Sequence, residues 1–268
     1  MDVRIEIEGE TATCKQGGIA RFSAPVADFL SALTARRDDA PFLDAIPEGT
    51  RFIRSHGDSV VLVLEKKPTL RTVRWLADDS PSPYGPKARY KKARLAFPFV
   101  VLVVVFRGGA LTGQSQCFYR VSPLAAPSDE LLLPNLYNVA KAYDQDCWVC
   151  LLNMEESLEP LSWSGKVDAI WNHIFGASFN KSSEEHEGMS YWSVMRSLDP
   201  RVASLRAWKK ASAKDPYFVL DVPWKPVGKS IETVMEEMLE TRRMKAFPPD
   251  ATSLAQVLNG VRKQKAKR

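Results

Sequence analysis

The run LAFPFVVLVVVF, Leu95–Phe106, decides the fold class of this chain. Every residue in the run except Pro98 is apolar, and the run is too short to cross a bilayer, so it predicts a strand buried on both faces. Gly108 and Gly109 follow closely, and Ala110–Arg120 is expected to return as the antiparallel neighbour. An antiparallel strand pair is therefore the expected centre of an α+β fold.

The composition is that of an ordinary globular protein. The chain has 268 residues, of which 45% are hydrophobic and 26% are charged. This predicts one elaborated domain or two small ones and excludes disordered and fibrous proteins. Lys and Arg together number 37 against 32 for Asp and Glu, which gives a net charge of +5. A dedicated nucleic-acid-binding protein concentrates positive charge in one patch, so this total alone does not indicate such a protein.

The cysteine content favours a reducing compartment. Four cysteines, Cys14, Cys117, Cys147 and Cys150, are too few for a disulfide-stabilised scaffold in a chain of this length. The first residues, MDVRIEIEGE, alternate charged and apolar side chains and lack the apolar core of a secretory signal. We therefore expect a soluble cytoplasmic protein.

An N-terminal ββαββ unit is expected over residues 1–76. Alternation of apolar and charged residues from Val3 to Ile7 is typical of a half-buried strand. The other strands are expected at Gly18–Phe22, Arg51–Ser55 and Ser59–Leu64, and the helix carries Val26, Phe29, Leu30 and Leu33 on one stripe. Residues 77–87 contain three prolines and one glycine and are the expected linker or long loop.

A core unit is expected over residues 88–226, followed by a helical extension with a basic tail over residues 227–268. The segment 122–146 contains three prolines and is long for a connection, which is typical of a functional surface. Apolar residues at helical spacing predict several helices, and one short run is strand-like. The expected helices are Val167–Phe175, Tyr191–Lys210, Ile231–Leu239 and a segment beginning at Ser253, and the strand-like run is Tyr217–Val222.

The closely spaced thiols Cys147 and Cys150 allow three interpretations. A redox pair needs its first thiol exposed at a helix N-terminus with a lowered pKa, but Asp144 and Asp146 precede it. A zinc site needs two more ligands, and the downstream histidines do not have the usual spacing. In the third interpretation the two cysteines are structural, on opposite faces of a strand, with one of them buried.

Common catalytic motifs do not occur in the sequence. Neither GxxxxGK nor GxGxxG is present, so no phosphate-binding loop is indicated. There is no GxSxG or HExxH motif, and the three histidines are scattered. We therefore expect no hydrolase triad, no bound cofactor and no metal.

One ordered series of features between Lys67 and Asn180 is more specific than any single motif. It consists of Lys67-Pro68, Arg71-Thr72, Trp75, Phe97–Val100 with the Gly-Gly turn, Pro123, Glu130–Asn135, Tyr137–Val139, Val149-Cys150, Asn153, Trp171, Phe175 and Phe179-Asn180. In this order the features resemble the PRTRC system protein B family and the wider prokaryotic family that is similar to ubiquitin-conjugating (UBC) enzymes. The resemblance implies a UBC-like antiparallel meander flanked by helices, in which a proline-rich loop precedes one cysteine.

The resemblance also implies a site. Cys150 occupies the position of the thioester cysteine, and Asn135, or alternatively Asn138, that of the asparagine whose amide stabilises the oxyanion when a lysine attacks. An activating enzyme delivers an already energised acyl group, so such a protein needs little acid-base equipment. We therefore expect a component of a bacterial protein-modification system, on a plasmid or mobile element or in a defence system. Its implied partners are a ubiquitin-like modifier and an activating-enzyme-like protein.

The sequence leaves two other functions open and does not decide whether the protein is an enzyme. A catalytically inactive UBC-like scaffold would bind partners through the long loop and the C-terminal helices. A nucleic-acid-binding protein would use the basic clusters Lys87–Arg94, Arg206–Lys210 and Arg262–Arg268. None of these clusters is interleaved with several aromatic residues for base stacking, so charged surfaces in contact with solvent are the simpler explanation.

Overall fold

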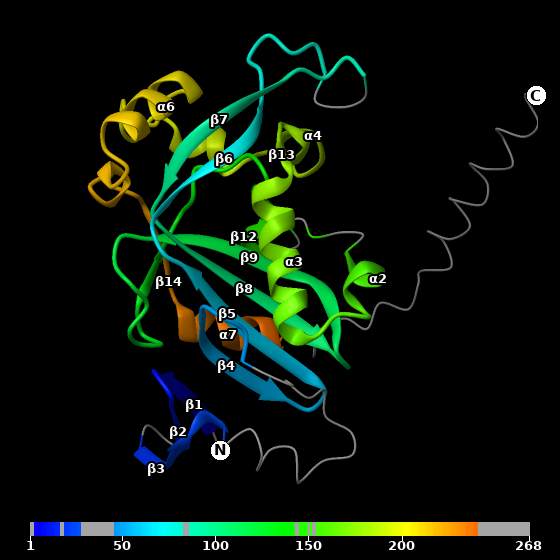
Figure 1. Ribbon diagram of the computed structural model, residues 1–268, viewed down its shortest axis with the longest axis vertical. Coiled ribbons are helices and arrows are strands. Elements are labelled where there is room, and N and C mark those ends of the chain that lie inside the picture. Colours follow the sequence, from blue (N-terminus) through cyan, green and yellow to red (C-terminus); the bar gives the residue numbers. More distant parts are fainter. Residues whose placement is uncertain are drawn as a thin grey trace, which may run out of the picture.

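The computed structural model describes residues 3–16, 19–27, 46–82, 86–142, 145–149, 151 and 154–240. In this part of the chain the fold is α+β, with a large, mostly antiparallel sheet and a few helices (Figure 1). The α+β class predicted from the sequence is confirmed. Among these residues no helix is both long and apolar enough to span a membrane.

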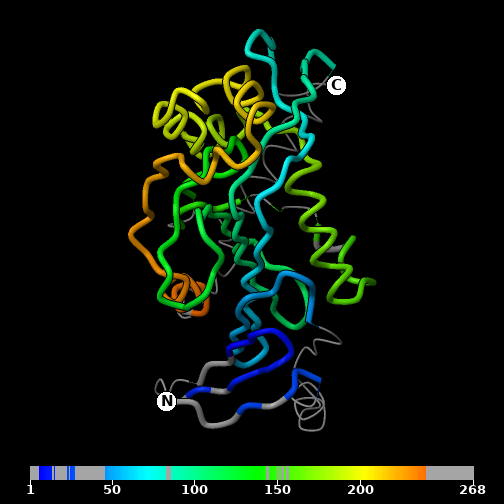
Figure 2. Tube along the Cα trace, turned by 60° about the vertical axis from the view of Figure 1, so that its left-hand side comes forward, coloured from blue at the N-terminus to red at the C-terminus, as the bar shows by residue number. Residues whose placement is uncertain are grey.

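The larger sheet runs through the whole described molecule. Its strands are β1 (Val3–Glu8), β2 (Thr11–Gln16), β3 (Ile19–Pro25), β4 (Thr50–His56), β5 (Ser59–Lys66), β8 (Phe99–Arg107), β9 (Ala110–Arg120), β10 (Glu130–Leu132), β11 (Val139–Ala142), β12 (Gln145–Val149) and β14 (Pro226–Ser230). Its main path is β11-β12-β9-β8-β5-β4-β1-β2-β3, and β10 joins β9 to β14. The N-terminal strands lie at one end of the molecule (Figures 1 and 2).

The apolar run forms the centre of the structure, but as two strands. β8 pairs with β5 along its whole length, and its residues Val101–Phe106 are fully buried, as predicted. The prediction of one continuous strand is wrong, because Leu95–Phe97 end β7 (Tyr90–Phe97), which belongs to a second sheet. Pro98 separates the two strands, since proline has no N–H to donate to a ladder. The Gly108-Gly109 turn into β9 is confirmed, with φ of +55° and +82°.

The N-terminal strands agree only partly with the predicted ββαββ unit. The predicted first strand and the pair Arg51–Ser55 and Ser59–Leu64 correspond to β1, β4 and β5. The strand predicted at Gly18–Phe22 overlaps β3, and β2 was not predicted. Most of the predicted helix, like the predicted helix at Ser253, lies outside the described residues. Because β5 pairs with β8, the sheet is continuous across the expected boundary at residue 76.

The smaller sheet is a long hairpin of β6 (Thr69–Leu76) and β7, joined in parallel by β13 (Ser178–Phe179). The described residues of the expected linker or long loop, 77–82 and 86–87, lie within the connection of this hairpin. β7 is the outer strand, and helix α6 (Leu205–Lys214) lies against it. The Trp208 indole donates to the Ala96 carbonyl at 2.9 Å, and the Ala96 N–H donates to Ser212 Oγ at 2.9 Å.

The helices lie on both sides of the large sheet. They are α2 (Glu155–Leu158), α3 (Trp163–Gly176), α4 (Ser182–His186), α5 (Tyr191–Met195), α6 and α7 (Ile231–Glu240), with a 3-10 turn η1 (Phe218–Leu220). α3 covers one face and α7 lies on the other (Figures 1 and 2). The helices predicted at Val167–Phe175 and Ile231–Leu239 are confirmed as parts of α3 and α7.

Two predictions for the C-terminal third are wrong. Tyr191–Lys210 is not one helical region, because α5 ends at Met195 and α6 begins only at Leu205, where Ser204 Oγ accepts from the Ala207 N–H. The strand-like run Tyr217–Val222 is a 3-10 turn. Phe218, Val219 and Val222 are buried, and the turn lies near β7 without pairing with it as a strand, which sequence periodicity alone does not distinguish.

Candidate functional site

The two asparagines singled out by the resemblance lie in the connection between β10 and β11. The Asn135 side chain is fully buried, yet neither its Oδ1 nor its Nδ2 has a hydrogen-bond partner among the described residues. The buried Oδ1 of Asn138 also has no partner there. An amide buried without partners costs about 1–3 kcal/mol, so two in one connection call for a functional or structural explanation.

The backbone around these amides is held firmly. Leu136 O accepts from the Trp192 N–H at 3.1 Å, which ties the connection to α5. The Tyr137 ring lies 5.0 Å from the Trp75 ring in an aromatic cluster between hairpin and helices. The connection is therefore held in place, while both polar atoms of the Asn135 amide and the Oδ1 of Asn138 have no partner among the described protein groups.

Cys150 itself lies outside the described residues, so its predicted role is not tested. The residues on either side of it are described, and both are buried: Val149 is 1% exposed and Leu151 is 5% exposed. Val149 pairs with Val139 in the β11–β12 hairpin, directly after Asn138. The hairpin therefore brings the chain entering position 150 next to the residue that follows Asn138.

Cys147, the first thiol of the pair, is a structural residue. It is fully buried in β12 with φ of +58°. Burial, together with the nearby Cys117 and the Asp146 carboxylate, raises the pKa of the Cys147 thiol well above its usual value. The redox interpretation required an exposed first thiol with a lowered pKa, so the structure contradicts it. Burial also raises the pKa of Cys117, to about 12.

The described residues give no support to a metal site. They contain no group of three or more His, Cys, Asp or Glu side chains placed to hold a metal ion. His173 lies at the end of α3, half-buried, and burial lowers its pKa.

The structure brings together two basic clusters that are far apart in sequence. The hydrogen bonds at Ala96 place α6, with the cluster Arg206–Lys210, along β7, with most of the cluster Lys87–Arg94. The basic side chains of β7 and α6 are Lys91, Lys92, Arg94, Arg206, Lys209, Lys210 and Lys214, all exposed, and none forms an ion pair with a described residue. The third predicted cluster, Arg262–Arg268, lies outside the described residues.

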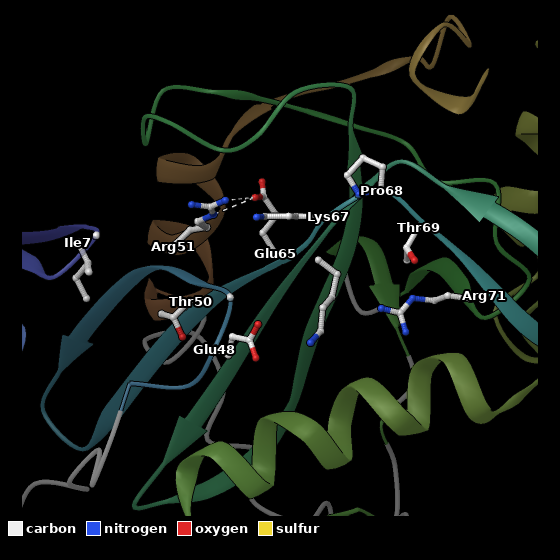
Figure 3. Close-up of a pocket in the computed structure, with 12 residues that line it drawn as sticks. Ile7, Glu48, Thr50, Arg51, Glu65, Lys67, Pro68, Thr69 and Arg71 are labelled. Atoms are coloured by element: carbon white, nitrogen blue, oxygen red, sulfur yellow. Dashed lines mark hydrogen bonds and ion pairs between the residues drawn. The ribbon is translucent and has the colours of Figure 1, made fainter. Parts of the chain in front are cut away.

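Sequence reasoning missed a basic pocket of about 620 Å³ between the β5–β6 connection and the chain entering β4 (Figure 3). Its charged lining consists of Glu48, Arg51, Glu65, Lys66, Lys67 and Arg71. Lys67-Pro68 and Arg71 were noted in the sequence only as parts of the resemblance. Their shared location depends on the pairing of β4 with β5 and the path of the chain into β6, which local sequence does not reveal.

Comparisons with known proteins add no assignment. No protein-family model, no curated protein and no solved structure matches this chain. The residues and their geometry are therefore the basis for the functional proposals.

Proposed function

We propose that this chain is a UBC-like protein that carries a ubiquitin-like modifier as a thioester on Cys150. The observation that supports the proposal is the fully buried Asn135 amide without a partner among the described residues, close in sequence to Asn138, whose Oδ1 is also buried without a partner there. An oxyanion-stabilising donor must be fixed in place and must not be occupied by another group in the resting protein. The order of meander, Pro-Asn loop, cysteine and helices agrees with the proposal.

The chemistry needs two transfers. The Cys150 thiolate attacks the thioester of the activating enzyme, so one C–S bond forms as another breaks and the enzyme's thiol is released. A lysine amine then attacks the new thioester, and the amide N–H of Asn135 or Asn138 donates to the developing oxyanion. Loss of the Cys150 thiolate then breaks the C–S bond and completes the isopeptide bond, and the proton lost by the amine passes to solvent.

The test uses the full chain with its cognate activating enzyme, the modifier and ATP. We expect an adduct that thiols cleave, and Cys150→Ala should abolish it. Cys150→Ser should replace the thioester by an ester that survives thiols but is cleaved by alkali. Cys147→Ala is the matched control, because the buried Cys147 should not carry the modifier. An adduct that persists in Cys150→Ala would contradict the proposal.

An inactive UBC-like scaffold is distinguished by thiol reactivity. Brief alkylation in native buffer, followed by intact mass and peptide mapping, should modify Cys150 in a thioester carrier. If Cys150 stays unmodified while the protein is folded, it is not accessible for transfer, and the scaffold function is favoured.

Nucleic-acid binding is a second candidate function, favoured by the position of α6 along β7. The exposed cations there, free of ion pairs with described carboxylates, form a surface suited to phosphates. Binding of single-stranded DNA should weaken steeply as the salt concentration rises. In the double variant Arg206→Gln, Lys210→Gln, the slope of the logarithm of the binding constant against the logarithm of the salt concentration should fall by about 0.7 for each phosphate that is no longer neutralised. Arg107→Gln, an exposed cation at the end of β8, is the control. No measurable binding near physiological salt would eliminate this function.

A further inference from the structure

The basic pocket contains one carboxylate that is already fully used. The Glu65 side chain is completely buried, and its Oε1 accepts from Arg51 Nε at 2.9 Å and Nη2 at 2.6 Å. Its Oε2 accepts from the Leu124 N–H at 2.6 Å. Figure 3 shows this pair next to Lys67, with dashed lines between Arg51 and Glu65. Glu65 and Arg51 therefore neutralise each other.

Two further cations are held over one aromatic pair on α3. Arg71 Cζ lies 4.3 Å from the centre of the Phe175 ring, and Lys66 Nζ lies 5.8 Å from that of Trp171. The two rings are stacked, with centres 5.8 Å apart. The two rings therefore hold two positive groups over neighbouring positions, although like charges repel. Neither Lys66 nor Arg71 forms an ion pair with a described carboxylate.

Arg71 has an unused donor. Its Nε is buried and has no hydrogen-bond partner among the described residues, and burial lowers the pKa of its guanidinium. A guanidinium normally satisfies its donors when it is removed from water, often with a carboxylate or a phosphate. Arg71 therefore has a donor that no described group uses and that an acceptor, preferably an anion, would satisfy.

The charge of the lining sets the kind of anion. With Arg51 and Glu65 paired, the other charged residues of the described lining are Lys66, Lys67, Arg71 and the exposed Glu48, which gives this lining a net charge of about +2. The volume of about 620 Å³ is typical of a small-molecule site. Arginine binds phosphate oxygens through two parallel N–H donors, and lysine supports them as a point charge.

We propose that this pocket binds a diphosphate group, either as free pyrophosphate or as part of a small molecule such as a nucleoside diphosphate. The phosphate oxygens accept from Arg71 and are neutralised by Lys66 and Lys67. Since the site involves neither Cys150 nor the asparagines, it is independent of the thioester proposal.

The test is calorimetric titration of the full chain with inorganic pyrophosphate and, separately, with ADP. Saturable binding of pyrophosphate and ADP alike supports the diphosphate site, and tighter binding of ADP assigns the pocket to a nucleotide. Lys66→Gln and Arg71→Gln should each weaken binding by about tenfold or more, as expected for removal of a charged hydrogen bond. Arg107→Gln at the end of β8 removes the same charge outside the pocket and should change affinity less than about twofold.

A second measurement does not depend on variants. The Nε–Hε NMR signal of Arg71 in the wild-type chain should shift on addition of pyrophosphate, while that of Arg107 at the end of β8 should not. Cys150→Ala should bind pyrophosphate as the wild type does, so failure of the thioester proposal leaves this result unaffected. The inference is overturned if the binding of pyrophosphate does not saturate, if Arg107→Gln weakens binding as much as Arg71→Gln, or if the Arg71 signal does not move.

Discussion

Replacing Asn135 by leucine should stabilise the fold and impair lysine transfer at the same time. The Asn135 amide is fully buried and unpartnered within the described residues. In the unfolded chain the same amide is hydrated, so its burial costs about 1–3 kcal/mol. Leucine has the same number and branching of side-chain heavy atoms and no polar atoms, and accommodating its larger methyl groups costs up to about 1.5 kcal/mol. We therefore expect Asn135→Leu to raise the free energy of unfolding by up to about 2 kcal/mol.

Urea denaturation measures this change. The midpoint should rise while the m-value, which reports the surface exposed on unfolding, stays constant. In a chain of this size the thermal midpoint should rise by about 2–4 °C for each kcal/mol. Asn172→Leu, the same substitution at an exposed position on α3, should change stability by less than about 0.5 kcal/mol. A fall in stability in Asn135→Leu would refute the reasoning, because it would mean that the amide makes hydrogen bonds in the folded protein.

The functional half of the prediction uses the conjugation assay. Asn135→Leu should leave loading of Cys150 intact but slow transfer to lysine by about 10²–10³-fold, the usual effect of removing one oxyanion donor. Unchanged transfer would remove Asn135 from the proposed mechanism. The same pair of measurements on Asn138→Leu then decides which of the two asparagines acts as the donor.

Four further predictions follow from named contacts. Because burial raises the pKa of Cys147, its thiol should resist iodoacetamide at neutral pH until the protein unfolds. Peptide mass mapping across a urea series measures this, and labelling of Cys147 in native buffer would contradict the prediction. Arg51→Ala leaves the completely buried Glu65 carboxylate without its cation and should cost about 3–5 kcal/mol in urea denaturation, with Glu65→Gln recovering part of this cost in the double variant. Trp208→Phe removes the indole donor to the β7 carbonyl and should cost about 1–2 kcal/mol; an unchanged midpoint would show that this bond contributes nothing. A hydrogen bond from a neighbouring arginine lowers the pKa of Asp199 in the folded state. The stability that the Asp199 carboxylate gives to the fold is therefore complete above the unfolded pKa of about 4, and it is lost as the pH falls through the folded pKa. The stability difference between wild type and Asp199→Asn should therefore shrink on acidification, and a difference that does not depend on pH would rule out this ion pair as its cause.

Strong local patterns predicted the centre of the fold, whereas weak ones failed at its margins. The apolar run and the Gly-Gly turn gave β8 and its antiparallel pairing with β9, because continuous burial leaves a clear signal. β2 and β14 carry no such signal, since β14 is only partly buried and its sequence is PVGKS. The role of Pro98 was underestimated: it does not interrupt a strand but divides the chain between two sheets.

The candidate site was predictable only in part. The resemblance singled out Asn135 and Asn138, and the structure adds that the whole Asn135 amide and the Oδ1 of Asn138 are buried and unpartnered among the described groups. The burial of Cys147 could not be predicted, because the spacing of Cys147 and Cys150 does not determine which of the two side chains faces the core. The basic pocket could not be predicted from the sequence, because it depends on contacts between residues that are far apart in the chain. Lys66 and Arg71 come together only because both lie over the same pair of rings on α3, about a hundred residues later in the chain.

The attachment of α6 to the outer strand of the hairpin has a consequence for self-association. An outer strand with free N–H and C=O groups is a template on which a strand from another molecule can add and start aggregation. At Ala96 both groups are already occupied by side chains of α6, and one of these is Trp208, whose ring lies 5.4 Å from Phe97 and 5.8 Å from Trp75. A second molecule would have to extract this tryptophan from the aromatic core before it could pair there. Resistance to strand addition is thus coupled to the packing of the protein interior, and variants that loosen Trp208 should form aggregates before they lose the rest of the fold.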